Sequence, residues 1–362
     1  MTSRRNFLTG AAATGVVFCS CGMLDAARAQ SPGGRRLPVA IDGKRVKTID
    51  VHAHCHFREA AALLGADASV LTPRVNGAEE AFIEIAQRFK AMDAQAVDME
   101  VLSINPFWYG RDRDLAAQIV KVQNEKLAEL CAAHPDRFAA FASLTLQAPD
   151  LAVQELETAV RRQGLKGAAI GGMVNGVEFS DPKFHPVWAK AEELGAVLFI
   201  HPQGVPELSR RLGGNGWLTN AIGNPLETTI ALSHLIFEGT LDRFPGLKII
   251  AAHGGGYLPS YADRSDHACL VGPAGCNPNI TLKKKPTEYL KQLYFDSLVF
   301  SPEAIRHLAA QVGPDQIVLG SDYPYPWQLH PVDHIFACDS LNEQQKAAVL
   351  GETAARLLKI NG

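Results

Sequence analysis

Positive charge is not in excess in this chain of 362 residues, in which 35 lysines and arginines stand against 38 aspartates and glutamates. The formal net charge of −3 and the lack of a basic stripe argue against nucleic acid as a partner. Cysteine is also scarce, and seven scattered residues do not make a disulfide framework. No internal repeat or low-complexity segment divides the chain. The sequence therefore predicts a soluble globular enzyme or binding protein with one large α/β domain.

Long apolar runs are lacking as well, and the N-terminal run Ala11–Phe18 is too short to span a bilayer comfortably. It follows the paired Arg4 and Arg5, and a small-residue cleavage site that ends at Ala29 comes after it. This order is typical of a twin-arginine signal peptide, which exports a folded protein. We expect a periplasmic or secreted protein without a stable membrane anchor, in three segments: a signal peptide (1–29), a linker (30–45) and one domain (46–362).

Five cysteines follow the predicted signal peptide. Cys269 and Cys276 bracket a loop that contains glycine and proline, and they could pair in an oxidising compartment. The sequence alone leaves a disulfide and two free thiols both open. Cys55 is expected to serve as a small buried hydrophobic residue.

Beyond the linker, apolar β-branched segments alternate with segments of helical periodicity. One helix is expected to start at Asp181-Pro182, with the aspartate as N-cap. A last helix is expected to start with a capping box formed by Ser340 and Glu343. Alternation and chain length favour a (β/α)8 TIM barrel, with an open doubly wound sheet as the alternative. The eight expected strands are 46–51, 97–104, 138–144, 167–170, 196–201, 248–253, 292–297 and 316–322.

Histidine or aspartate side chains stand at the ends of several expected strands. His52 and His54 are one residue apart, so in a strand both leave the backbone on one face and form a chelating pair. His201 ends the fifth strand, His253 the sixth and Asp322 the eighth. Barrel enzymes place their chemistry at the C-terminal ends of the strands, so we expect these side chains to meet. Such ligands suit Zn²⁺ or another borderline divalent ion.

Three motifs carry a family resemblance: IDVHAH (49–54), HGGG (253–256) and GSDYP (320–324). Matching stretches run from about residue 46 to the C-terminus. With these motifs in this order, the sequence resembles the amidohydrolase superfamily, in the branch that includes α-amino-β-carboxymuconate-ε-semialdehyde decarboxylase. The resemblance implies a metal-dependent (β/α)8 barrel of amidohydrolase type.

The resemblance also implies four metal ligands, of which the aspartate takes part in catalysis as well: His52, His54, His201 and Asp322. His253 then remains as a catalytic acid/base that does not bind the metal. Three imidazoles and one carboxylate leave an open position, as a catalytic zinc site requires. We expect one divalent ion per chain, Zn²⁺ first and Mn²⁺ as the alternative, because no lysine ends the fourth or fifth strand as in binuclear relatives.

Arg264 corresponds to a family arginine that reaches the substrate carboxylate in a neighbouring subunit. A guanidinium suits bidentate capture of a carboxylate, and this role requires a homodimer or a larger homo-oligomer. The alternative is a surface ion pair with Asp263 or Asp266. Arg74 is the nearest counterpart of a second family arginine, in a segment that departs from the family pattern.

Three further residues are expected to contact the substrate. Trp108 and Trp217 lie in loops after expected strands, where they could wall a pocket or pack within the loop. His56 follows the chelating pair on the same strand face and would point toward the site.

These observations predict a metal-dependent decarboxylase of an aromatic or unsaturated carboxylic acid. A hydrolase of a lactone or ester, or a hydratase, would use the same residues and the same fold, so the fold does not separate these activities. A metal-binding or ligand-binding module without catalysis is the third reading, and the presence of His253 beside a complete ligand set argues against it.

Overall fold

The structure of the protein is a computed structural model that describes residues 38–65, 83–214 and 217–361. These residues belong to one compact unit, Arg36–Gly362. The predicted signal peptide and Arg74 lie outside the described residues. Among the described helices, none combines the length and the apolar character needed to cross a bilayer.

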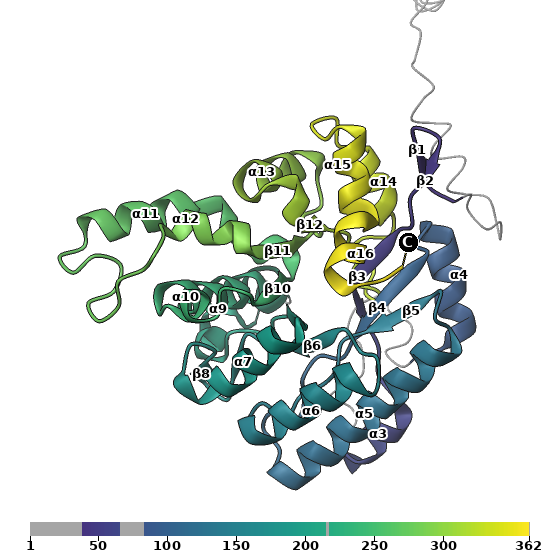
Figure 1. The fold of residues 1–362 in the computed structure, drawn as a ribbon, viewed down its shortest axis with the longest axis horizontal. Coiled ribbons are helices and arrows are strands. Elements are labelled where there is room, and N and C mark those ends of the chain that lie inside the picture. Colours follow the sequence, from purple (N-terminus) through teal and green to yellow (C-terminus); the bar gives the residue numbers. More distant parts are fainter. Residues whose placement is uncertain (1–37, 66–82, 215–216, 362) are drawn as a thin grey trace, which may run out of the picture. The chain divides into compact units, whose positions relative to one another are not determined.

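In the described part of the chain, eight parallel strands form two sheets that meet at both edges (Figure 1). At one edge Ala142 N–H donates to Gly167 O over 2.8 Å, and at the other edge Val51 N–H donates to Leu319 O over 2.9 Å. The strands therefore close into the predicted (β/α)8 barrel, and the alternative of an open sheet is wrong. In barrel order they are β3 (Ile49–His54), β4 (Met99–Ser103), β5 (Phe138–Ala140), β6 (Gly167–Ile170), β9 (Val197–Ile200), β10 (Lys248–Ala251), β11 (Leu293–Asp296) and β12 (Ile317–Val318).

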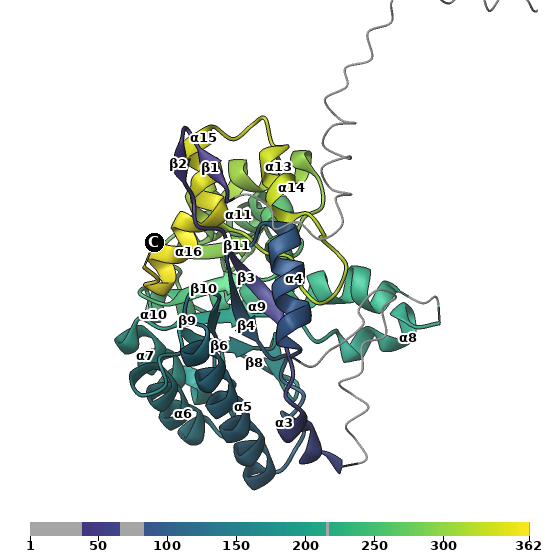
Figure 2. The same cartoon turned by 90° about the vertical axis from the view of Figure 1, so that its right-hand side faces the viewer.

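Helices lie outside the strands, as the two views in Figures 1 and 2 show. The described helices are α3 (Arg58–Ala62), α4 (Ile85–Gln95), α5 (Arg113–Ala133), α6 (Pro149–Arg161), α7 (His185–Leu194), α8 (Ser209–Leu212), α9 (Asn224–Phe237), α10 (Thr240–Arg243), α11 (Ala262–Val271), α12 (Pro286–Tyr289), α13 (Pro302–Val312), α14 (Pro331–Phe336), α15 (Glu343–Ala347) and α16 (Thr353–Leu358).

The helix starts follow local capping chemistry. Asp181 accepts the N–H of Lys183 as predicted, at the start of a 3-10 turn that leads into α7. The predicted Ser340 cap is wrong, because α15 begins at Glu343 with Asn342 as its N-cap. The carboxamide of Asn342 accepts the N–H of Gln345 over 2.9 Å, and the Gln345 side chain accepts the N–H of Asn342 over 2.9 Å. Asparagine therefore takes the capping position that the sequence pattern gave to serine.

Part of the segment assigned to the linker is folded. Residues 40–45 form a hairpin in which β1 (Ala40–Ile41) pairs antiparallel with β2 (Lys44–Arg45). The turn residues Asp42 and Gly43 both have positive φ, 49° and 74°, which an Asp-Gly pair adopts at low cost. Ile41 of this hairpin is buried. A second hairpin joins β7 (Met173–Val174) and β8 (Val177–Glu178).

The barrel core is formed by apolar side chains of the strands together with the last helix. Phe199 of β9 stacks on Phe141 at a ring distance of 5.7 Å, and Leu357 and Leu358 of α16 pack in the same cluster. Cys269 and Cys276 form a disulfide across the end of α11, and Cys55 is buried and free, as predicted. The packed strands hold their C-terminal ends, and the residues that follow them, at fixed positions.

Candidate active site

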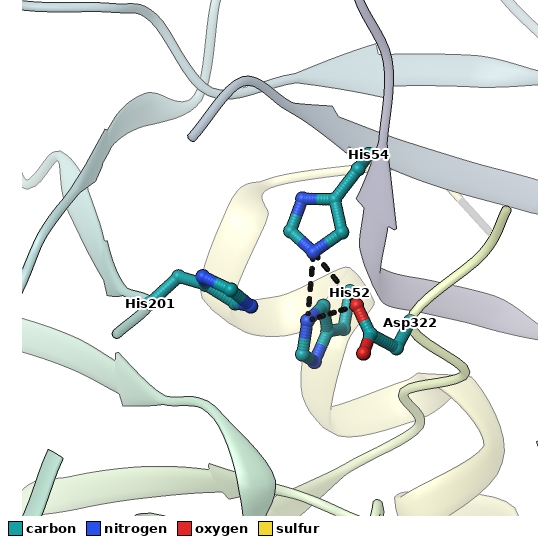
Figure 3. A group of neighbouring side chains, drawn as sticks. All are labelled: His52, His54, His201 and Asp322. Atoms are coloured by element: carbon teal, nitrogen blue, oxygen red, sulfur yellow. Dashed lines mark hydrogen bonds and ion pairs between the residues drawn. The ribbon is translucent and has the colours of Figure 1, made fainter. Parts of the chain in front are cut away.

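Four potential metal ligands converge at the C-terminal ends of the strands (Figure 3). His52 and His54 end β3, His201 directly follows β9, and Asp322 lies in the loop after β12. One ligand atom from each side chain lies within 4.8 Å of the others, and all four residues are buried. The structure thus brings together the four residues that the family resemblance implied as ligands.

The spacing within this cluster fits a single small ion. Nε2 of His54 lies 3.0 Å from Nε2 of His52 and 2.8 Å from Oδ1 of Asp322, and Nε2 of His52 lies 3.1 Å from the same oxygen. Ligand atoms that each lie about 2.0–2.2 Å from one tetrahedral zinc ion are about 3.3 Å apart. Three imidazoles and a carboxylate are also a donor set that borderline divalent ions prefer. The residues present therefore fit a divalent metal.

Hydrogen bonds at Nδ1 orient two of the three ligand imidazoles. Nδ1 of His52 lies 2.6 Å from Oδ2 of Asp296, and Nδ1 of His54 lies 3.1 Å from Oγ of Ser103. Such outer contacts fix the tautomer, so that Nε2 keeps the lone pair for the metal. Nδ1 of His201 is buried and has no hydrogen-bond partner among the described residues.

Asp296, at the end of β11, links a ligand to the neighbouring turn. Besides His52, its carboxylate accepts the backbone N–H groups of His253, Gly254 and Leu298 at 3.0, 2.9 and 3.1 Å. A single buried carboxylate therefore holds both the first ligand and the turn that carries the expected acid/base.

Two buried carboxylates set the protonation of the cluster. Burial would lower the pKa of His52, but the carboxylates of Asp322 and Asp296 raise it to about 10. Burial and the imidazoles of His54 and His52 hold the pKa of His201 well below its ordinary value. Burial opposes ionisation of Asp322, yet the neighbouring His52 keeps its pKa well below the ordinary range. Before an ion binds, Asp322 is therefore ionised and His201 is neutral, the forms that bind metal, whereas His52 is an imidazolium that releases its Nε2 proton when the ion binds.

His253 stands beside the four ligands and faces the open side of the site. Its Nε2 lies 3.8 Å from Oδ2 of Asp322, and its side chain is 15% exposed against 6% for the aspartate. Its ring centroid lies 5.2 Å from that of His52 and 5.3 Å from that of His201. This position suits a group that exchanges protons with a bound molecule.

His253 and Asp322 share an unusual backbone conformation. Their φ angles are 55° and 67°, in the left-handed region that non-glycine residues rarely adopt and that is frequent at functional sites. Gly254, Gly255 and Gly256 also have positive φ. A Cβ at Gly256 would lie 2.0 Å from the carbonyl oxygen of Pro225, so only glycine allows the turn to approach α9 this closely.

A pocket of about 350 Å³ opens beside the cluster. Its wall is mainly apolar and aromatic, with two carboxamides, and no described residue that lines it is a lysine or an arginine. Its walls include His253 and Asp322 on the metal side and Asn220, Asn224, Tyr257 and Trp327 elsewhere.

The residues predicted to contact the substrate lie in different environments. Trp217 is exposed, and its ring lies 5.9 Å from that of Trp327 in the pocket wall. His56 is buried, with its ring 6.0 Å from that of Phe107. Arg264 is exposed on α11 and is not among the residues that line the pocket.

Trp108 has a packing role. It is fully buried, and its indole N–H donates to the carbonyl oxygen of Leu144 over 2.9 Å. Because the side chain is fully buried, neither its ring faces nor its N–H group is open to a ligand. We therefore do not include Trp108 in the substrate site.

Sequence reasoning overlooked the residues that support the ligands. Asp296 ends the seventh strand, and its place at a strand end is the same signal that identified Asp322. Ser103 ends β4 in the same way. Asn220 and Asn224 carry no such signal, because they line the pocket from the start of a helix.

Comparison with known proteins places this architecture in a family. The family model for amidohydrolases matches residues 49–360. The chain belongs to the amidohydrolase family. Within this amidohydrolase, the matched region spans the whole barrel, from the chelating pair on β3 to the residues after α16.

Two relatives define the branch. The amidohydrolase is 33% identical over 278 residues to 2-amino-3-carboxymuconate-6-semialdehyde decarboxylase of Dictyostelium discoideum, covering 76% of each chain. It is 31% identical over 289 residues to gamma-resorcylate decarboxylase of Rhizobium radiobacter, covering 76% of this chain and 87% of the relative. This agrees with the branch that the motifs indicated.

Solved structures agree with this assignment. The 5-carboxyvanillate decarboxylase of Sphingomonas paucimobilis has a TM-score of 0.78 at 27% identity, and the match covers 87% of this chain and all of that one (100%). Dihydroxybenzoic acid decarboxylase from Polaromonas sp. has a TM-score of 0.76 at 25% identity over 88% of this chain and 98% of that one, and holds manganese and the inhibitor 2-nitroresorcinol. The predicted fold and family are therefore confirmed.

Proposed function

We propose that this amidohydrolase is a metal-dependent decarboxylase of an aromatic or unsaturated carboxylic acid. The observation that carries the proposal is the buried cluster of three histidines and one aspartate, which opens on a pocket beside His253. The relatives described above, all decarboxylases by name, support this activity over hydrolysis of a lactone or ester.

The metal would be held by the four clustered side chains, His52, His54, His201 and Asp322. When bound, a divalent ion supplies an electrophilic centre that polarises an oxygen of the substrate. The donor set favours Zn²⁺, whereas the Polaromonas relative holds manganese, so we propose one ion per chain with zinc first and manganese as the alternative. Metal analysis of the purified protein distinguishes the two.

Decarboxylation breaks the bond between the substrate carbon and its carboxylate, and a proton must reach that carbon as carbon dioxide leaves. His253 can hold this proton at Nε2, at the edge of the pocket. Oδ2 of Asp322 lies 3.8 Å from Nε2 of His253. Asp296 holds the backbone of His253 and so keeps the ring in place.

The pocket walls fit a flat substrate. Trp327, Phe300 and Tyr257 supply aromatic surface that can stack on a conjugated acid and exclude water. The carboxamides of Asn220 and Asn224 can form hydrogen bonds with polar substituents.

We further propose a homodimer or larger homo-oligomer in which Arg264 of one subunit binds the substrate carboxylate in its partner. Arg264 is exposed, it forms no ion pair with another described residue, and the described pocket walls lack a cation of their own. Asp266, one of the alternative partners of this arginine, instead accepts the N–H and the hydroxyl of Thr287.

The twin arginines and the cleavage site support a further proposal, export of the folded enzyme to the periplasm. Fractionation of cells that express the full chain, compared with an Arg4→Lys/Arg5→Lys variant, tests it. Accumulation of the wild-type protein in the cytoplasm would contradict it.

Replacement of His253 by alanine tests the proposed activity. We expect the His253→Ala variant to keep about one metal ion per chain and to lose turnover by about 10²-fold or more, because general acid/base catalysis contributes this much. Release of carbon dioxide from a panel of hydroxybenzoates and muconate-type acids is the assay, with base uptake on lactones measured in parallel. Metal loss in the variant would make His253 a ligand, and acid release from lactones without carbon dioxide production would favour a hydrolase.

A further inference from the structure

Glu227 is a buried carboxylate outside the ligand set. It lies in the first turn of α9 and is 5% exposed. Burial raises its pKa to about 7, and the groups that oppose this effect are three backbone N–H groups. An ionised group in such a place lowers stability unless its hydrogen bonds are complete.

The three N–H groups come from loops that follow two different barrel strands. Oε1 accepts the N–H of Gly172, after β6, over 3.2 Å. Oε2 accepts the N–H of Gln203 over 2.5 Å and also that of Gly204. Gln203 and Gly204 directly follow His201 and Pro202 in sequence. One side chain therefore holds the loop that begins with a metal ligand.

His201 is the ligand that most needs such support. His52 and His54 are oriented through Nδ1 by Asp296 and Ser103, whereas Nδ1 of His201 has no hydrogen-bond partner among the described residues. Its ring position must therefore depend on its backbone. That backbone is held on one side by the N–H of His201, which donates to Ile170 O over 2.9 Å, and on the other by Glu227.

The second turn of α9 holds the loop of His253. Oγ1 of Thr229 accepts the N–H of Tyr257 over 2.8 Å and donates to Pro225 O over 2.7 Å. Gly256 packs directly against Pro225 O. The loop that follows a ligand and the loop that carries the acid/base are thus both anchored to the first two turns of α9, and the first residues of this helix, Asn224 and Pro225, line the pocket.

We propose that Glu227 is a positioning residue of the metal site: it holds the loop 202–204, fixes the backbone and ring of His201, and so strengthens metal binding without touching the metal. The inference rests on the metal site of the proposed function and does not depend on which reaction the enzyme performs.

A matched pair of variants separates this role from a general contribution to folding. Glu227→Gln keeps the shape of the side chain and replaces one acceptor oxygen by a donor. The control is Glu155→Gln on α6, whose carboxylate accepts the N–H and the hydroxyl of Thr145, both over 2.7 Å, in the loop after β5. Neither β5 nor this loop carries a metal ligand.

The measurement is the dissociation constant of Zn²⁺ from the full-length apo protein, in competition with a chromophoric chelator. We expect Glu227→Gln to weaken zinc binding by about 10-fold or more, as loss of an outer-shell contact typically does. Glu155→Gln should bind zinc like the wild type. The visible spectrum of the Co²⁺-loaded protein should change in the first variant and not in the second, because it reports the coordination geometry.

Zinc binding and a cobalt spectrum equal to the wild type in Glu227→Gln would overturn the proposal, even if the variant is less stable. If Glu227→Gln does not fold, Gly172→Ala replaces it, because a Cβ at Gly172 would lie 2.5 Å from Oε1 of Glu227 and displace the carboxylate. Wild-type zinc affinity in Gly172→Ala would then refute it. A wild-type protein that binds no divalent ion would refute the metal site itself, whereas metal binding without decarboxylation would refute only the proposed reaction.

Discussion

Replacing Asp296 by asparagine should weaken metal binding far more than the loss of one charge suggests. The Oδ2 atom accepts from His253 N–H and faces Nδ1 of His52, and Oδ1 accepts from Gly254 and Leu298 N–H. An asparagine must put its NH₂ group on one of these sides. If the NH₂ group takes the place of Oδ1, the N–H groups of Gly254 and Leu298 face another donor. If it takes the place of Oδ2, the N–H group of His253 faces a donor, and His52 either faces one too or moves its proton to Nε2.

The expected losses of stability and of metal affinity follow from this geometry. A buried N–H group that loses its acceptor costs about 1–3 kcal/mol, so two such groups lower the free energy of unfolding by about 2 kcal/mol or more. A proton on Nε2 of His52 removes the lone pair that faces the ligand cluster. Loss of an outer-shell partner of a ligand typically weakens metal affinity about 10–100-fold.

Asp50→Asn is the matched control. Asp50 is as buried as Asp296 and accepts the N–H groups of His52 and Ser321 at 3.0 and 3.2 Å, but it contacts no ligand ring. Both N–H groups donate to Oδ1 of Asp50, so an asparagine keeps these bonds with its carbonyl oxygen and turns its NH₂ group toward Oγ of Ser321. Chelator competition and urea unfolding on both variants test the reasoning. Equal zinc affinities for Asp296→Asn and the wild type would refute it.

Two further predictions concern stability. Arg88 and Glu100 form a buried ion pair at 2.6 Å, and Arg88→Met should lower the free energy of unfolding by about 3–5 kcal/mol because Glu100 is left unpaired. Urea denaturation measures this, and a second change, Glu100→Leu, should recover part of the loss; no recovery would show that packing of Arg88 on Tyr323 dominates. Removal of metal with a chelator should lower the melting temperature, and free Zn²⁺ at about 100 times its dissociation constant should restore about 2.7 kcal/mol. A melting temperature that does not change when zinc is added would contradict the assignment of His52, His54, His201 and Asp322 as ligands.

The barrel and the meeting of the strand-end side chains could be predicted because both depend on simple periodic signals, whereas the division into four ligands and one acid/base came from the family resemblance. Each strand is an apolar run that ends at a defined residue, and parallel strands bring their C-terminal ends to one face. His52, His201 and Asp322 therefore meet, although they lie on separate strands. The pattern needs no knowledge of side-chain packing.

Supporting contacts could not be predicted in this way. Asp296 touches His52 across 244 positions of sequence, and Glu227 reaches Gly172 across 55. Packing between distant elements decides which loop each buried carboxylate faces. Local sequence propensity does not predict such contacts. The misplaced cap of α15 has a local cause, since serine and asparagine are nearly equal caps and only the reciprocal bond to Gln345 decides between them.

The edge where β3 meets the end of β12 is also the place where the ligands join. His54 N–H donates to Tyr323 O, and Asp322 N–H donates to His52 O over 2.8 Å, so two of the backbone bonds that complete the barrel involve ligand residues. The site therefore cannot exist in a partly synthesised chain that has not yet placed its last strand. Metal binding is therefore a late step of folding, and a bound ion indicates that β3 and the end of β12 have come together.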